Sequence, residues 1–112
     1  MKIIIESVGM ELTEAVRVFI EGKFRTLERL MKRFEGEGES TINVAVLRTT
    51  RHHRKGEIYE VVAGVRLPKK SLRIAESGED VRMAADQAKD VLRMEIEKYK
   101  EKVTEKKRGP GK

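Results

Sequence analysis

The sequence predicts a two-layer α+β domain, in which two long helices pack on one face of a four-stranded sheet in the order β-α-β-β-β-α. Three short segments alternate along the chain, as half-buried strands do, and a fourth is a β-branched run that also suits a strand. Two long segments repeat apolar residues every three or four positions, as amphipathic helices do. The chain has 112 residues, of which 38% are hydrophobic, and this fits one domain with one core.

The first strand and the first helix lie in the N-terminal third of the chain. Residues 2–6, KIIIE, form a β-branched run that suits a strand. Thr13 suits a helix N-cap, and we predict one continuous helix over residues 13–34, which ends at the glycine-rich segment EGEGES. Its apolar residues recur at steps of three and four: Val16, Ile20, Phe24, Leu27, Met31 and Phe34.

Three further strands follow in the middle of the chain. Residues 41–49, TINVAVLRT, and residues 59–67 both alternate, so they predict a hairpin whose tip is RTTRHHRKG, residues 48–56. A tight turn at residues 68–70 leads into a short fourth strand, which stops at Ser77-Gly78.

The second helix is predicted to begin near Glu79 or Asp80, because acidic residues suit the first turn of a helix. Gly109-Pro110-Gly111 ends any helix. We therefore divide the chain into an α+β domain, residues 1–105, and a basic, flexible tail, residues 106–112. The apolar stripe of this helix is Val81, Ala85, Ala88, Leu92, Ile96, Tyr99 and Val103.

Positive charge is concentrated in two segments. The net charge is +6, but residues 48–56 carry four Lys or Arg and no acid, and residues 98–112 carry seven against two acids, which together make +9. The other 88 residues therefore sum to −3. A localised basic surface is typical of a protein that binds a polyanion.

Composition excludes several kinds of site. The chain has no cysteine, and its two histidines, His52 and His53, are adjacent and surrounded by cations, so we expect no metal site. The serines lie at predicted turns or strand edges, and neither a phosphate-binding loop nor a dinucleotide fingerprint is present, so we expect no enzyme, cofactor or small-molecule substrate. The apolar run near the start spans three residues, too few for a signal peptide or a membrane span, and we expect a cytoplasmic protein that binds no membrane.

Each predicted helix carries a row of cations. At 100° per residue, four cations of the second helix fall within about 40°, beside the apolar stripe: Arg82, Lys89, Arg93 and Lys100. Four acids are expected on the far side: Asp86, Asp90, Glu97 and Glu101. The first helix is expected to carry its cations opposite the core: Arg25, Arg29, Lys32 and Arg33. A solvated surface is the alternative for either row taken alone. With few aromatic residues free to stack on bases, the rows favour contacts to phosphates and sugars of structured RNA.

Two long motifs carry a family resemblance. Residues 10–30, MELTEAVRVFIEGKFRTLERL, place Thr-Glu-Ala before an aliphatic residue, then a Lys-Phe pair and Leu-Glu. Residues 78–102, GEDVRMAADQAKDVLRMEIEKYKEK, space aspartates and alanines before alternating lysines. Over residues 2–103 the chain resembles the ribosome hibernation promoting factor and ribosome-associated inhibitor family, in its short form without a C-terminal dimerisation domain. It departs from the family pattern where Arg82 replaces a tyrosine and Ala85 a bulky aliphatic residue.

The resemblance implies a fold like that of the double-stranded RNA-binding domain with an added strand. It also implies binding to rRNA of the small ribosomal subunit at the decoding channel, where such proteins occlude messenger and transfer RNA. By position, the resemblance implies that Lys23 of the first helix contacts rRNA. It implies the same for five residues of the second helix: Lys89, Arg93, Lys98, Lys100 and Lys102.

We therefore expect a stress-response factor that silences idle ribosomes and is monomeric when free. The expected rRNA-binding residues are Lys23, Arg25, Arg29, Arg51, His52, His53, Arg54, Lys55, Arg82, Lys89, Arg93, Lys98, Lys100 and Lys102. One alternative is a generic structured-RNA module that acts away from the ribosome. Another is an interaction module whose basic tail binds an acidic partner or a membrane.

Overall fold

The computed structural model describes residues 1–34, 39–49 and 58–108, and four strands in it form one sheet. β1 (Lys2–Val8), β2 (Thr41–Thr49), β3 (Ile58–Leu67) and β4 (Lys70–Gly78) lie side by side in that order. β1 is parallel to β2, and the other two pairings are antiparallel. The predicted hairpin of β2 and β3 is therefore confirmed, whereas the first strand runs to Val8 and not only to Glu6.

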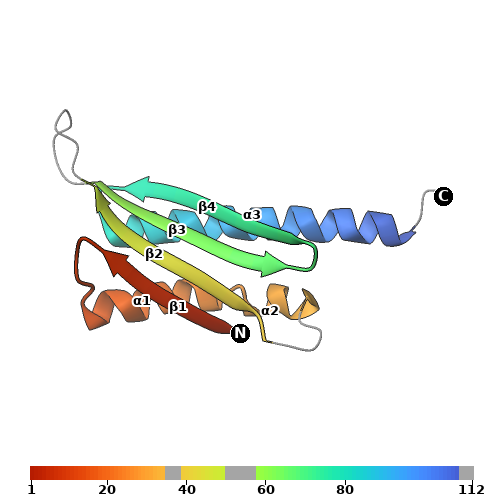
Figure 1. The fold of residues 1–112 in the computed structure, drawn as a ribbon, viewed down its shortest axis with the longest axis horizontal. Helices are drawn as coiled ribbons and strands as arrows, with labels where there is room; N and C mark the ends of the chain where they lie inside the picture. The colour runs from red at the N-terminus through yellow and green to blue at the C-terminus, as the bar shows by residue number, and fades with distance from the viewer. Residues whose placement is uncertain (35–38, 50–57, 109–112) are drawn as a thin grey trace.

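The helices pack on one face of this sheet. α1 (Glu14–Arg25) packs on β1 and beside α3 (Val81–Arg108), which packs on β3 and β4. Between α1 and β2 lie a one-turn helix, α2 (Glu28–Met31), and a 3-10 turn, η1 (Lys32–Phe34). Figure 1 shows the helices behind the sheet, and the last turns of α3 project past the turn between β3 and β4. The predicted two-layer α+β fold is confirmed.

The first helix was predicted as one piece, and this prediction was wrong because the helix is interrupted at Thr26 and Leu27. The hydroxyl of Thr26 donates to the carbonyl of Lys23 at 2.6 Å, and the N–H of Leu27 donates to the carbonyl of Phe24 at 3.0 Å. These bonds to the third residue back tighten the end of α1. Hydrophobic periodicity did not reveal the break, because Phe24, Leu27 and Met31 remain buried on both sides of it.

The core lies between the sheet and the helices. Alternate residues of β2 and β3 meet one stripe of α1 and one of α3, as their periods require. The buried set is Ile20, Phe24, Leu27, Met31, Ile42, Val44, Val46, Val61, Ala63, Val65, Leu67, Leu72, Ala84, Ala85, Ala88, Leu92 and Ile96. Because three of the α3 positions are alanines, the helix axis can lie close to the sheet.

The start of α3 is held by a side-chain cap and by close packing. The N–H of Met83 donates to Oδ1 of Asp80 at 2.8 Å, so Asp80 acts as the predicted acidic N-terminal residue. A Cβ atom added to Gly78 would lie 3.1 Å from the backbone nitrogen of Ala84. Gly78 therefore allows the end of β4 and the first turn of α3 to approach closely.

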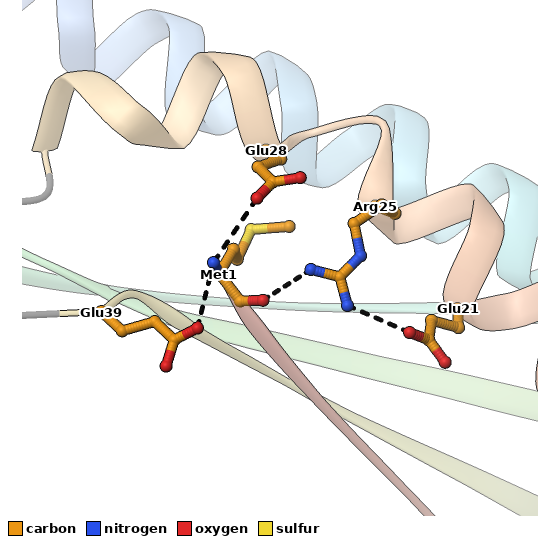
Figure 2. Close-up of polar contacts among 5 residues, drawn as sticks. All are labelled: Met1, Glu21, Arg25, Glu28 and Glu39. Carbon is orange, nitrogen blue, oxygen red and sulfur yellow. Dashed lines mark hydrogen bonds and ion pairs between the residues drawn. The ribbon is translucent and has the colours of Figure 1, made fainter.

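Ion pairs join the start of β1 to its neighbours (Figure 2). The ammonium group of Met1 lies 3.6 Å from Oε2 of Glu28 and 3.2 Å from Oε2 of Glu39. The carbonyl of Met1 accepts a hydrogen bond from Arg25, whose guanidinium also lies 3.0 Å from Oε2 of Glu21. The cluster connects β1 to α1, to α2 and to the segment that precedes β2.

The predicted turn after β3 is confirmed at Pro68 and Lys69, with Leu67 paired to Lys70. Lys69 adopts a φ of 66°, a left-handed conformation that disfavours residues with a Cβ atom. The hydroxyl of Tyr99 in α3 donates to the carbonyl of Pro68, and the Tyr99 ring centroid lies 5.5 Å from that of Phe34. Tyr99 thus connects α3 to the turn and to η1.

Candidate nucleic-acid interface

The two long helices meet along a surface that we call the helix seam. It consists of four cations, one phenylalanine and two carboxylates: Phe19, Lys23, Arg82, Asp86, Lys89, Asp90 and Arg93. Lys23 and Phe19 come from α1, one turn apart, and the other five residues come from α3. The ammonium of Lys23 lies 5.5 Å from the centroid of the Phe19 ring, and the guanidinium of Arg82 lies 5.3 Å from it. Both distances suit a cation–π interaction, so Phe19 holds one cation from each helix.

Carboxylates of α3 pair with two of the seam cations. Nζ of Lys23 lies 3.0 Å from Oδ1 of Asp86, which forms an ion pair between the helices. Nζ of Lys89 lies 2.7 Å from Oδ1 of Asp90. The hydrogen bond from Lys89, together with the positive charges of Lys89, Arg93 and Lys23, holds the pKa of Asp90 below its usual value. Asp90 is therefore ionised at neutral pH.

These pairs correct the expectation that the acids lie apart from the cations. Asp86 follows Arg82 by four residues and Asp90 adjoins Lys89, so both carboxylates border the basic row instead of opposing it. Arg82 and Arg93 are exposed and form no ion pair with another described residue, whereas Lys23 and Lys89 are already paired. The seam thus combines two open guanidinium groups with two neutralised lysines.

The other predicted contacts on α3 divide between two sides of the helix. Lys100 follows Arg93 by seven residues, close to two full turns, and so continues the row of the seam. Lys98 follows Lys89 by nine residues, which places it about 180° around the axis. Lys98 and Lys102 line a groove of about 230 Å³ beside Lys70 of β4, on the side of α3 that faces away from α1.

The cations predicted on one side of the first helix do not share one helical face. They belong to three separate elements, with Arg25 in α1, Arg29 in α2, and Lys32 and Arg33 in η1. Arg25 lies on the side of α1 that faces β1, because its guanidinium donates to the carbonyl of Met1. Arg29 is exposed. The interruption of the helix therefore disperses the predicted row.

Five predicted contacts lie outside the described residues: Arg51, His52, His53, Arg54 and Lys55. The strands that lead to and from them are described, and Thr49 pairs with Ile58 across the hairpin. The hydroxyl of Thr49 donates to the carbonyl of Ile58 at 3.0 Å. The role of the basic hairpin tip remains a prediction.

Sequence reasoning named the seam cations but missed the residues that organise them. Phe19 was not recognised, although its position four residues before Lys23 puts both on one face of α1. Of the two residues expected to depart from the family pattern, Arg82 stacks on that ring and Ala85 is fully buried. Within the described residues no helix is long and apolar enough to cross a membrane.

The fold and the seam define a small α+β domain that presents paired and open cations between two helices. The chain belongs to the family described as Sigma 54 modulation protein / S30EA ribosomal protein, whose model matches residues 3–104. This match confirms the family resemblance drawn from the two sequence motifs. The chain is therefore a member of a family of ribosome-associated proteins.

Two solved structures share the fold. The N-terminal domain of Protein Y from Thermus thermophilus superposes with a TM-score of 0.68 at 24% identity, over 88% of this chain and 99% of that one. A ribosomal subunit interface protein from Coxiella burnetii gives a TM-score of 0.64 at 21% identity, over 89% of this chain and 98% of the other. A search of curated proteins returns no match.

Proposed function

We propose that this protein is a translation-silencing factor that binds rRNA of the small ribosomal subunit at the decoding channel and blocks messenger and transfer RNA. The family match over residues 3–104 carries the proposal. It is supported by the helix seam, whose guanidinium groups suit phosphate oxygens. In this proposal the protein acts without catalysis, as a monomer in the cytoplasm, on ribosomes that stress has left idle.

The seam suits contacts to the sugar-phosphate backbone more than contacts to bases. Arg82 and Arg93 are exposed, so each can form charge-assisted hydrogen bonds with phosphate oxygens. Phe19 is already covered by Lys23 and Arg82, which leaves its ring poorly placed to stack on a base. Backbone contacts of this kind position a protein on folded RNA by shape. Affinity should therefore fall steeply as salt concentration rises.

Charge reversal along the α3 row tests the proposal. The triple variant K89E/R93E/K100E should lose co-sedimentation with small subunits, because three contacts become repulsive while the core stripe of α3 is unchanged. Circular dichroism and thermal unfolding would verify that the variant is folded. A folded triple variant that sediments with small subunits as the parent protein does would overturn the assignment.

A further inference from the structure

The face of the sheet that turns away from the helices holds a shallow groove. Its volume is about 490 Å³, and β3 and β4 supply most of its lining. The residues that matter for its chemistry are Glu6, Asn43, Gly64, Arg66, Ser71 and Arg73. No element of the described chain covers this face, and Figure 1 shows it turned toward the viewer.

Strand register explains why a hollow forms at this place. Asn43, Gly64 and Arg73 pair with one another across β2, β3 and β4, so they form one row on the open face. Gly64 has no side chain, and it makes the floor of the groove between longer neighbours. A Cβ atom added there would lie 3.5 Å from the carbonyl oxygen of Leu72, an ordinary contact, so the backbone does not require glycine. A glycine that packing does not demand suits close approach of a ligand.

The two arginines of the groove are free to bind a ligand. Arg66 and Arg73 are exposed and form no hydrogen bond or ion pair among the residues that the structure describes. On the other side of the sheet, by contrast, Lys23 and Lys89 are paired with carboxylates. The hydroxyl of Ser71 and the amide of Asn43 add uncharged hydrogen-bond donors beside the arginines.

We propose that this groove binds the sugar-phosphate backbone of RNA as a second contact surface, opposite the helix seam. The proposal rests on the proposed function, since it takes the RNA to be that of the small subunit. Two exposed guanidinium groups with neighbouring hydroxyl and amide donors match the oxygens of a phosphodiester. No aromatic side chain lines the groove among the described residues, so stacking of bases is not expected there.

The carboxylate of Glu6 gives the groove a hydrogen-bond acceptor. Glu6 lies on β1, at the margin of the groove farthest from Arg73 in strand order. A carboxylate would repel a phosphate placed beside it, but it can accept a hydrogen bond from a ribose 2′-hydroxyl. The groove therefore offers guanidinium groups to a phosphate on one side and a hydrogen-bond acceptor to a ribose hydroxyl on the other.

The two surfaces suit a protein that is held between two walls of RNA. The shortest dimension of the molecule is 18 Å, which is the depth of one sheet and one helix layer. Figure 1 shows the helices, which carry the seam, on one side of the sheet, and the groove belongs to the opposite, open face. Contacts on both faces would also block a channel better than attachment by one face.

The test measures binding to purified small ribosomal subunits across a salt series for R66Q/R73Q. The matched control is K2Q/K69Q, which removes the same charge at two exposed lysines that do not line the groove. We expect R66Q/R73Q to weaken binding by at least about tenfold, and to lower the slope of log affinity against log salt by about 2, because two phosphate contacts are lost. The control should change either quantity much less.

A second pair of variants tests the shape of the groove without changing charge. G64V fills the floor with an isopropyl group, and A75V places the same isopropyl side chain at an exposed position of the same face, outside the groove. G64V should lower affinity severalfold while A75V binds as the parent does, and both should unfold at temperatures close to that of the parent.

The outcomes separate this inference from the proposed function. If the parent protein and K2Q/K69Q bind small subunits and R66Q/R73Q binds equally well, the groove proposal alone is wrong. If R66Q/R73Q binds more weakly but keeps the salt slope of the parent, the groove contacts something other than phosphate, and the proposal is overturned. If the parent protein does not bind small subunits at all, the proposed function fails and the groove proposal falls with it.

Discussion

Removal of the seam carboxylates should strengthen binding to RNA. In the free protein, Oδ1 of Asp86 lies 3.0 Å from Nζ of Lys23, and Oδ1 of Asp90 lies 2.7 Å from Nζ of Lys89. A phosphate that approaches the seam must compete with these carboxylates, or accept their repulsion. The variant D86N/D90N keeps side chains of the same shape and removes both negative charges. It should therefore bind small subunits more tightly than the parent protein.

The size of the gain follows from the geometry of the pairs. Two unit charges a few ångströms apart in a medium close to water attract by about 1 kcal/mol, and salt screening reduces this further for an exposed pair such as Lys23–Asp86. Release of one such cation should therefore raise affinity by about threefold, and release of both by about tenfold. Folding stability should change little, because the carboxylates of both pairs are about half exposed and ion pairs in contact with solvent contribute little to it.

The measurement is an equilibrium titration of small subunits with fluorescently labelled protein at several salt concentrations. The control is E97Q/E101Q, which makes the same change in net charge on α3, at two exposed acids that form no ion pair among the described residues. If both double variants gain affinity equally, the effect comes from net charge alone. An unchanged affinity for D86N/D90N would refute the competition between carboxylate and phosphate.

Three further predictions concern stability and can be checked together by chemical denaturation. Tyr99→Phe should lower the free energy of unfolding by about 1 kcal/mol, because it removes the hydrogen bond from α3 to the carbonyl of Pro68. Gly78→Val should cost about 1 to 3 kcal/mol through overpacking against α3, whereas Gly64→Val should cost much less; equal losses would contradict the packing difference. Lys69→Gly should raise stability by up to about 1 kcal/mol, because glycine relieves the left-handed strain; a loss would show that the turn is not strained.

The fold could be predicted in large part because its periodic signals are strong. Alternate residues of β2 and β3 and the apolar stripe of α3 are buried, and these elements form in the parts of the chain where the patterns predict them. The interruption after Arg25 was missed, since the buried residues keep their spacing across Thr26 and Leu27. The parallel pairing of β1 with β2 was also not predicted, because it depends on how α1 crosses the sheet and not on local sequence.

The candidate site was only partly accessible from the sequence. The row of Arg82, Lys89 and Arg93 follows from helical geometry alone. The ion pair between Lys23 and Asp86 joins two helices, so it depends on how they pack and has no signature in the spacing of residues. The exposed arginines of the groove were likewise not recognised, because they lie on different strands whose register places them together.

Binding to the small subunit in competition with transfer RNA tests the central claim most directly. Purified protein would be sedimented with small subunits, large subunits and intact ribosomes across a salt series, with and without transfer RNA. The proposed function predicts salt-sensitive binding to small subunits and intact ribosomes that transfer RNA displaces. Binding that ignores transfer RNA, or that is equally strong for large subunits, would contradict a position in the decoding channel.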